Sequence, residues 1–126
     1  MNKQQLFEIL KEKNSLNQTQ EEQWDYIFKE LRCIETEEEL GSSVDEEKLQ
    51  LTTFLLLSFQ TSGLAAPCDI YPVYNGDIIC EWRTDETLTT MHIVNDKKAI
   101  FAHCNAKDFK TMSGVIPISE FLMGRE

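Results

Sequence analysis

The stretch YPVYNGDIICEWR, residues 71–83, decides how the second half of the chain is expected to fold. Asn75-Gly76 lies between two runs of strand-forming residues, and this dipeptide is a strong signal for a β-hairpin with a two-residue turn. Side chains alternate between the two faces of a strand, so Trp82 is predicted to face the core and Glu81 the opposite surface. The stretch therefore predicts a hairpin in which Glu81 and Trp82 lie on opposite faces.

Two further turns, at residues 84–87 and 95–98, extend this hairpin into a four-stranded antiparallel meander over residues 69–104. Pairing Tyr71 with Cys80, Arg83 with Leu88 and Val94 with Ala99 gives each strand one consistently apolar face. The face expected to pack on helices carries Tyr71, Val73, Ile78, Cys80, Trp82, Thr89, Met91, Ile93, Ile100, Ala102 and Cys104. The opposite face is expected to carry Ile70, Pro72, Ile79, Glu81, Arg83, Leu88, Thr90, His92, Phe101 and His103. Pro72 predicts an edge strand, because proline cannot donate to a strand ladder.

The first half of the chain, residues 1–62, is predicted to be helical. Apolar residues recur at helical spacing around Leu6 and again from Trp24, and a third, central helix is expected from about Val44 to Thr61. Gly63 is expected to end that helix. Three N-terminal helices on one face of the meander make a single α+β domain over residues 1–126.

The C-terminal segment, residues 105–126, is expected to be irregular, and Met112-Ser113-Gly114 is expected to interrupt regular secondary structure. Ser119 can cap a final helical turn, and its apolar residues either dock on the core or remain as an exposed tail that contacts a partner.

A formal net charge of −10 is the main departure from an average composition, since 41% apolar and 27% charged residues are typical of a folded protein. This charge opposes binding to nucleic acid or an anionic membrane and suits a protein partner with a basic surface. Solubility is the plainer explanation. The acidic run that contains Glu37, Glu38 and Glu39 is either a patch for such a partner or a solvated helix end.

Several classes of site are not indicated. The four cysteines are widely spaced, with no C-x-x-C pair, so we expect core residues or free thiols rather than a metal site. Nucleotide-binding, hydrolase and metalloprotease motifs are missing from the sequence, and no cofactor or catalytic residue is predicted. The apolar run Phe54–Leu57 is too short for a membrane span, and residues 1–14 show no secretory signal, so a cytoplasmic protein is expected.

The face opposite the helices is the candidate site, because both histidines are predicted to lie on it close to Glu81. Its candidate binding residues are Ile79, Glu81, Thr90, His92, Phe101 and His103. Acid, hydroxyl and imidazole groups could form an acid/base or metal site, but a flat face does not exclude water. Mixed apolar and polar groups favour a recognition surface, and the alternatives are a plain solvent-exposed face or a face covered by another element.

The segment 69–104 resembles a family of small uncharacterised bacterial proteins that share a β-hairpin with proline, glycine, a hydrophobic residue and a Glu-Trp pair. The matching positions are Pro72, Gly76, Ile78, Glu81, Trp82, Leu88 and Ile93. The resemblance implies a bacterial or phage origin and a structural hairpin, and it brings no chemistry with it.

Three functional hypotheses follow. The first is a small acidic, non-enzymatic interaction protein of the inhibitor, immunity-protein, antitoxin or secretion-chaperone type, with a possible homodimer. The second is a small-molecule-binding domain or minor hydrolase that uses Glu81, His92 and His103 on a concave sheet. The third is a subunit of a larger bacterial assembly.

Overall fold

The computed structural model describes residues 2–15, 20–36, 46–73, 77–94 and 98–122. Its elements, in chain order, are α1 (Lys3–Ser15), α2 (Gln20–Thr36), α3 (Glu46–Thr61), β1 (Asp69–Pro72), β2 (Ile78–Arg83), β3 (Thr87–Ile93), β4 (Lys98–Asn105), β5 (Lys110–Pro117) and α4 (Ser119–Leu122). The strands form one antiparallel sheet in the order β1-β2-β3-β4-β5. The predicted α+β class is confirmed, but the meander has five strands rather than four.

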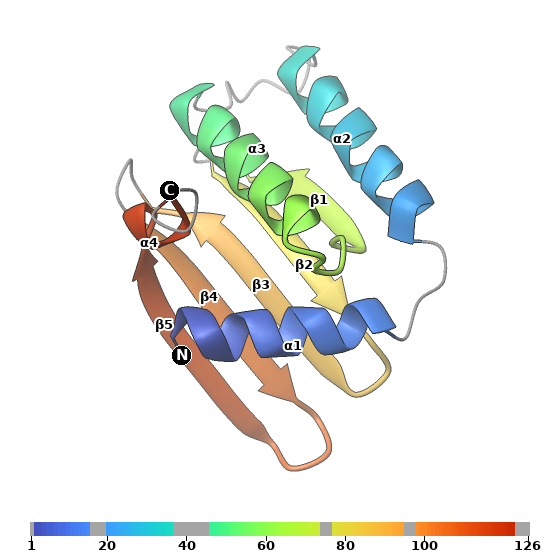
Figure 1. Ribbon diagram of the computed structural model, residues 1–126, viewed down its shortest axis with the longest axis vertical. Coiled ribbons are helices and arrows are strands. Elements are labelled where there is room, and N and C mark those ends of the chain that lie inside the picture. Colours follow the sequence, from blue (N-terminus) through green and yellow to red (C-terminus); the bar gives the residue numbers. More distant parts are fainter. Residues whose placement is uncertain (1, 16–19, 37–45, 74–76, 95–97, 123–126) are drawn as a thin grey trace.

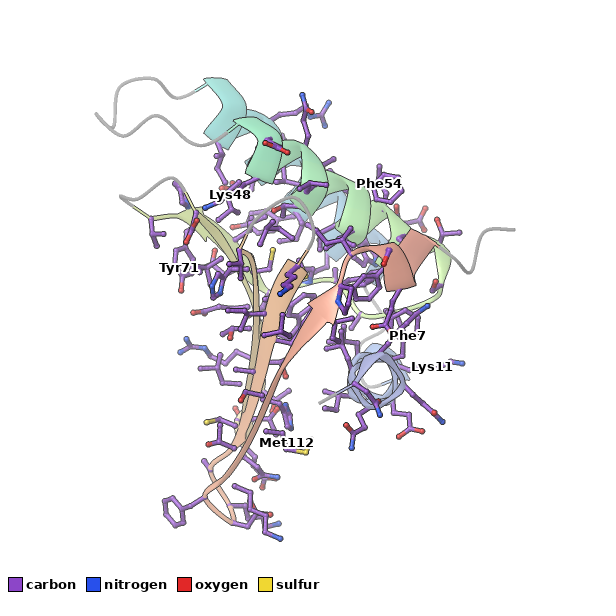
Figure 2. The ribbon with its side chains drawn as sticks, turned by 90° about the vertical axis from the view of Figure 1, so that its left-hand side faces the viewer. Phe7, Lys11, Lys48, Phe54, Tyr71 and Met112 are labelled. Atoms are coloured by element: carbon purple, nitrogen blue, oxygen red, sulfur yellow. The ribbon has the colours of Figure 1, made fainter. Side chains whose placement is uncertain are left out.

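The described elements form two layers (Figure 1). α1 lies over the half of the sheet nearer the β4–β5 turn, and α3 lies over the opposite half. α2 lies beside α3. Figure 2 shows the helices on one side of the sheet, which we call its inner face, while side chains such as Tyr71 project from the other side, its outer face. None of the helices in the described part of the chain has the length and apolar character needed to cross a bilayer.

An aromatic cluster fills the core between the helices and the inner face. Phe59 of α3 lies 6.3 Å from the ring of Trp82 and 5.5 Å from the ring of Phe121, between centroids. Phe101 of β4 lies 5.9 Å from Phe121. Contacts of this kind fix α4 against the core through Phe121, while Met123 lies outside the described residues.

The end of α3 follows the sequence signal closely. Gly63 has a φ of 77°, the left-handed conformation that glycine adopts without a steric cost. Gly63 N–H donates to Gln60 O at 3.1 Å and Leu64 N–H donates to Phe59 O at 3.0 Å. These two bonds form a Schellman motif, which satisfies carbonyl groups at the helix end and turns the chain toward the sheet.

The connection after this helix end joins three other elements. The indole of Trp82 in β2 donates to Ala65 O at 2.8 Å, and the indole of Trp24 in α2 donates to Leu64 O at 3.3 Å. The Ala65 N–H donates to Leu10 O of α1 at 3.1 Å. Both tryptophans are buried, and Trp82 faces the helices as predicted.

The β2–β3 register is the one that the sequence predicted. Arg83 pairs with Leu88 and Cys80 with Met91. Thr89 therefore lies on the inner face, where it is fully buried.

The β1–β2 register was wrong by one residue. Ile70, not Tyr71, pairs with Cys80. The Asn75-Gly76 pair lies outside the described residues. A shift by one residue exchanges the faces of Ile70, Tyr71, Pro72 and Val73. Burial explains the outcome, since Ile70 becomes buried while the Tyr71 hydroxyl reaches a polar partner on the outer face.

The β3–β4 register was wrong in the same way, because Ile93 pairs with Ala99 where Ile100 was predicted. The side chains whose faces are exchanged are Ile100, Phe101, Ala102, His103 and Cys104. Phe101 is fully buried on the inner face. Burying this large ring together with Ala99 favours the observed register over one that would bury Ile100 and Ala102.

The fifth strand was missed. The predicted break at Met112-Ser113-Gly114 is wrong, because these residues lie inside β5 and pair with β4. Gly114 stands opposite Phe101 in the ladder. The strand is an edge strand with little buried surface, so its sequence lacks the apolar alternation that reveals a strand.

The two edges of the sheet differ, and β1 is closed to further pairing. Val73 N–H donates to Asp77 O at 2.9 Å, so odd-numbered residues of β1 bond to β2 and even-numbered residues direct their backbone groups outward. The outward N–H of Ile70 donates to Asp69 Oδ1 at 2.9 Å, and Pro72 has no N–H. Within Asp69–Pro72, the strand therefore offers no free donor to another strand.

We predict that Thr52→Val in α3 raises the free energy of unfolding by about 1 kcal/mol. Thr52 is 1% exposed and its Oγ1 has no hydrogen-bond partner among the described residues. Valine keeps the shape of the side chain and removes the buried hydroxyl. Denaturant unfolding monitored by circular dichroism measures the change.

Thr53→Val is the matched control, because the Thr53 hydroxyl donates to Leu49 O at 2.9 Å. We expect it to be neutral or destabilising. A loss of stability in Thr52→Val as large as in the control would show that the Thr52 hydroxyl is hydrogen-bonded after all.

Candidate binding face of the sheet

The outer face of the sheet is a continuous surface with contributions from every strand. Its residues, from the pairing of the strands, are Asp69, Tyr71, Ile79, Glu81, Arg83, Leu88, Thr90, His92, Ile100, Ala102, Cys104, Thr111, Ser113 and Val115. One cross-strand row runs from Tyr71 through Ile79, His92 and Ile100 to Val115. In Figure 2 no helix of the described chain lies against this side of the sheet.

Four of the predicted binding residues lie together on the outer face. Ile79 pairs with His92 and Glu81 pairs with Thr90, so the four occupy two adjacent rows. All four side chains are half-buried by their neighbours in the sheet. These four side chains therefore share one face of the sheet, and none of the described helices covers it; their role in binding stays a prediction.

Two other predicted binding residues are on the inner face instead. Phe101 belongs to the aromatic core. His103 lies beside Thr89, with 2.7 Å between His103 Nδ1 and Thr89 Oγ1. The one-residue shift of β4 causes both errors, since it exchanges the two faces of that strand. Glu37, Glu38 and Glu39 lie outside the described residues.

The predicted acid/base arrangement is therefore not formed. Glu81 and His92 are on the outer face while His103 is on the inner one, so the three side chains do not converge. No group of three or more acidic, histidine or cysteine side chains in the described part of the chain is placed to hold a metal ion. Burial raises the pKa of the Cys80 thiol, which makes this core cysteine a poor nucleophile at neutral pH.

The carboxylate of Glu81 is held in place by two neighbours. Tyr71 Oη donates to Glu81 Oε1 at 2.7 Å, and Arg83 Nη2 donates to Glu81 Oε2 at 3.0 Å. The hydrogen bond to Glu81 is the main cause that raises the pKa of Tyr71 to about 12, with burial and the negative charges of Glu81 and Asp69 adding to it. The site thus presents a charged group whose orientation is fixed before any partner arrives.

A hollow of about 420 Å³, which was not predicted from the sequence, lies at the end of the outer face. Its floor is the row Arg83, Leu88, Cys104 and Thr111, and its rim is formed by the turns at 84–87 and 105–109. The two turns are joined by a hydrogen bond of 2.8 Å from Ala106 N–H to Glu86 O. Phe109 and Thr111 belong to the β4–β5 turn and to β5, which the sequence did not predict, so the hollow was missed.

Phe109, at the rim of the hollow, has an exposed aromatic ring and a backbone conformation that is unfavourable for a residue with a Cβ. Its side chain is 90% exposed, and its φ is 57°, in the left-handed region that residues with a Cβ seldom adopt. Exposed aromatic groups held at such positions are candidates for recognition.

Comparison of the chain with protein-family models, with curated proteins and with solved structures finds no match.

We predict that ionisation of Tyr71 weakens the fold at high pH. In the unfolded chain a tyrosine loses its proton near pH 10, whereas folded Tyr71 keeps it up to about pH 12. The stability that Tyr71 contributes is therefore fully present below pH 10 and is lost as the pH rises from about 10 to about 12. Tyr71→Phe is expected to lose less stability than the wild type over this range, as measured by denaturant unfolding.

Glu81→Gln provides the second measurement for this prediction. Removing the carboxylate should lower the pKa of Tyr71 toward its ordinary value in an ultraviolet titration, with Tyr71→Phe subtracted to remove the other tyrosines. An unchanged titration curve in Glu81→Gln would contradict the assigned cause.

We predict that Phe109→Gly raises the free energy of unfolding by about 1 kcal/mol, because glycine adopts a positive φ without the clash of a Cβ. Lys107→Gly in the same turn is the control and should lower the stability slightly. Thermal and denaturant unfolding measure both variants. Destabilisation by Phe109→Gly would mean that the exposed ring packs more usefully than its conformation costs.

Proposed function

We propose that this protein is a non-enzymatic protein-interaction factor that binds a partner with a basic surface through the outer face of its sheet. The observation that carries the proposal is the outer face itself, a five-stranded surface that no described element covers and that mixes apolar and polar groups. Half-buried Ile79 and Ile100 lie on either side of His92, with the fixed carboxylate of Glu81 nearby.

The composition of this face suits recognition. The centre of a protein interface combines apolar contact area with a few oriented polar groups, surrounded by a polar rim. Ile79, His92 and Ile100 would supply the contact area, and Glu81 the oriented charge. Its neighbours Tyr71 and Arg83 hold that carboxylate, so binding would cost little side-chain entropy.

Electrostatics supports a basic partner. The outer face itself carries acids and bases in similar numbers, while the net charge of −10 belongs to the chain as a whole. Exposed acids such as Glu21, Glu22 and Asp25 lie on α2, away from the face. A negative field of this kind speeds the approach of a positively charged protein and discourages nucleic acid, while the local contacts set the affinity.

The proposed types of interaction factor are those that such a face could serve in a protein of bacterial or phage origin. An inhibitor, immunity protein, antitoxin or secretion chaperone masks a surface of another protein and needs no catalytic group. A cytoplasmic subunit of a larger bacterial assembly would use the outer face in the same way.

The hollow beside Phe109 supports a second candidate function, the binding of a small molecule. A volume of about 420 Å³ falls in the range of ligand pockets, which begins at roughly 300 Å³. The residues that line it combine apolar Leu88 and Phe109 with charged Arg83 and Glu86. This candidate needs no acid/base pair and does not depend on His103.

The test is affinity capture from a lysate of the source organism with the wild type and two matched variants. Ile100→Asp introduces a charge in the middle of the outer face, whereas Leu57→Asp introduces the same charge at an exposed apolar position of α3. We expect one basic protein to be retained by the wild type and by Leu57→Asp, to be lost with Ile100→Asp, and to dissociate as the salt concentration rises. Circular dichroism confirms that both variants are folded.

Retention of the same protein by all three baits would place the contact elsewhere on the molecule. A partner without a basic surface, or a complex that is insensitive to salt, would count against the electrostatic part of the proposal.

A further inference from the structure

Among the described residues, the outer edge of β5 is open to pairing with another strand, whereas the outer edge of β1 is closed. Val94 N–H donates to Lys98 O at 3.0 Å, so even-numbered residues of β4 bond to β3 and its odd-numbered residues bond to β5. Ala99 pairs with Ile116 and Phe101 with Gly114. Even-numbered residues of β5 therefore bond to β4, and Thr111 and Val115 direct their backbone N–H and C=O groups away from the sheet.

The open edge is also where exposed apolar groups gather. Phe109, Met112 and Val115 are exposed by 90%, 39% and 53%, and they account for half of the large exposed hydrophobic residues in the described part of the chain. Figure 1 shows β5 at the border of the sheet with no described element beyond it, and α4 covers only its Pro117 end. An edge strand of this length usually carries a device against pairing, such as a central lysine, proline or bulge. Lys110 and Pro117 stand only at the two ends of β5.

We propose that two copies of this chain pair through β5, antiparallel about a two-fold axis at Ser113. This register sets Thr111 of one copy opposite Val115 of the other, twice over because of the symmetry. Both residues direct their backbone groups outward, so each such pair exchanges two main-chain hydrogen bonds. The sheets of the two copies join into one, with all helices on one side and both outer faces on the other.

Side chains across the axis fit the same register. On the inner side Met112 lies opposite Gly114 of the second copy, where the missing side chain leaves room for the thioether. On the outer side Val115 lies opposite Thr111, a pair of β-branched residues that is favourable across antiparallel strands. At the end of the pairing, Phe109 reaches the level of Pro117. Each of the three exposed apolar groups thereby gains a neighbour on the second copy: Pro117 for Phe109, Gly114 for Met112 and Thr111 for Val115.

The local charge at this edge does not oppose a second copy. Two molecules of net charge −10 repel each other, but the segment 109–118 contains no acidic residue. No like charges face each other in the proposed register, since Lys110 stands opposite Ile116. The pairing is short, so we expect a concentration-dependent dimer in the micromolar range rather than an obligate one. Salt screens the repulsion and strengthens this dimer, whereas it weakens the partner complex of the proposed function.

Charged substitutions of Ser113, the residue on the proposed two-fold axis, test the proposal. Ser113→Lys places two lysines opposite each other in the dimer and should lower its association constant by about fivefold or more, and Ser113→Glu should do the same. An equimolar mixture of the two variants pairs lysine with glutamate and should associate more tightly than either variant alone. Sedimentation velocity from about 1 µM to about 1 mM measures all three.

Gln60→Lys and Gln60→Glu are the controls, because they make the same changes of charge at an exposed position of α3. They should leave the association constant unchanged. The Ile100→Asp variant should also dimerise normally, so the loss of the partner complex and the loss of the dimer can be told apart.

Three results would overturn the proposal. The wild type could stay monomeric throughout, the Ser113 variants could dimerise like the wild type, or their mixture could show no gain. A fourth result assigns the edge to a strand of another protein instead: the chain alone is monomeric, and Ser113→Lys abolishes a complex that Gln60→Lys leaves intact.

Discussion

The fold depends on the hydrogen bonds that converge on two consecutive residues, Leu64 and Ala65. Their carbonyl groups accept the indole N–H groups of Trp24 and Trp82, and the Ala65 N–H donates to Leu10 O. α1, α2 and β2 are thus fixed to the end of α3 within one short connection. Both indoles are buried, and a buried indole N–H without an acceptor would be costly. The position of the sheet under the helices follows from this arrangement.

Much of the fold could be predicted from the sequence, because the features concerned depend on residues that are close together in the chain. Gly63 ends α3 because only a residue without a Cβ adopts its φ freely. The turn between β2 and β3 sets a register that places Trp82 and Met91 inward. Helix positions, the order of elements and the separation of Glu81 from Trp82 all depend on neighbours close in the chain.

The registers of β1 and β4 could not be predicted, because apolar residues stand at consecutive positions there. Ile70 precedes Tyr71, and Ile100 precedes Phe101, so alternation alone permits either face. Tertiary contacts decide between them: Phe101 packs on Phe121, and the Tyr71 hydroxyl needs the carboxylate of Glu81. The candidate site inherited these errors, which is why Ile79, Glu81, Thr90 and His92 were placed on the outer face correctly and Phe101 and His103 were not. The hollow near Phe109 could not be predicted because it is formed in part by β5 and the turn before it, which carry no apolar alternation.

The closed edge of β1 has a consequence for how far any assembly of this protein can grow. A sheet that can pair at both edges adds copies without end and forms filaments, which is the hazard of open antiparallel sheets. In this protein one end of the sheet is terminated by Pro72 and by the bond between Asp69 and the Ile70 N–H. Edge-to-edge growth through β5 uses up, on both molecules at once, the one edge that is open among the described strands. The product is finite, and two terminated borders enclose it, so a protein with an exposed strand can still remain dispersed at high concentration.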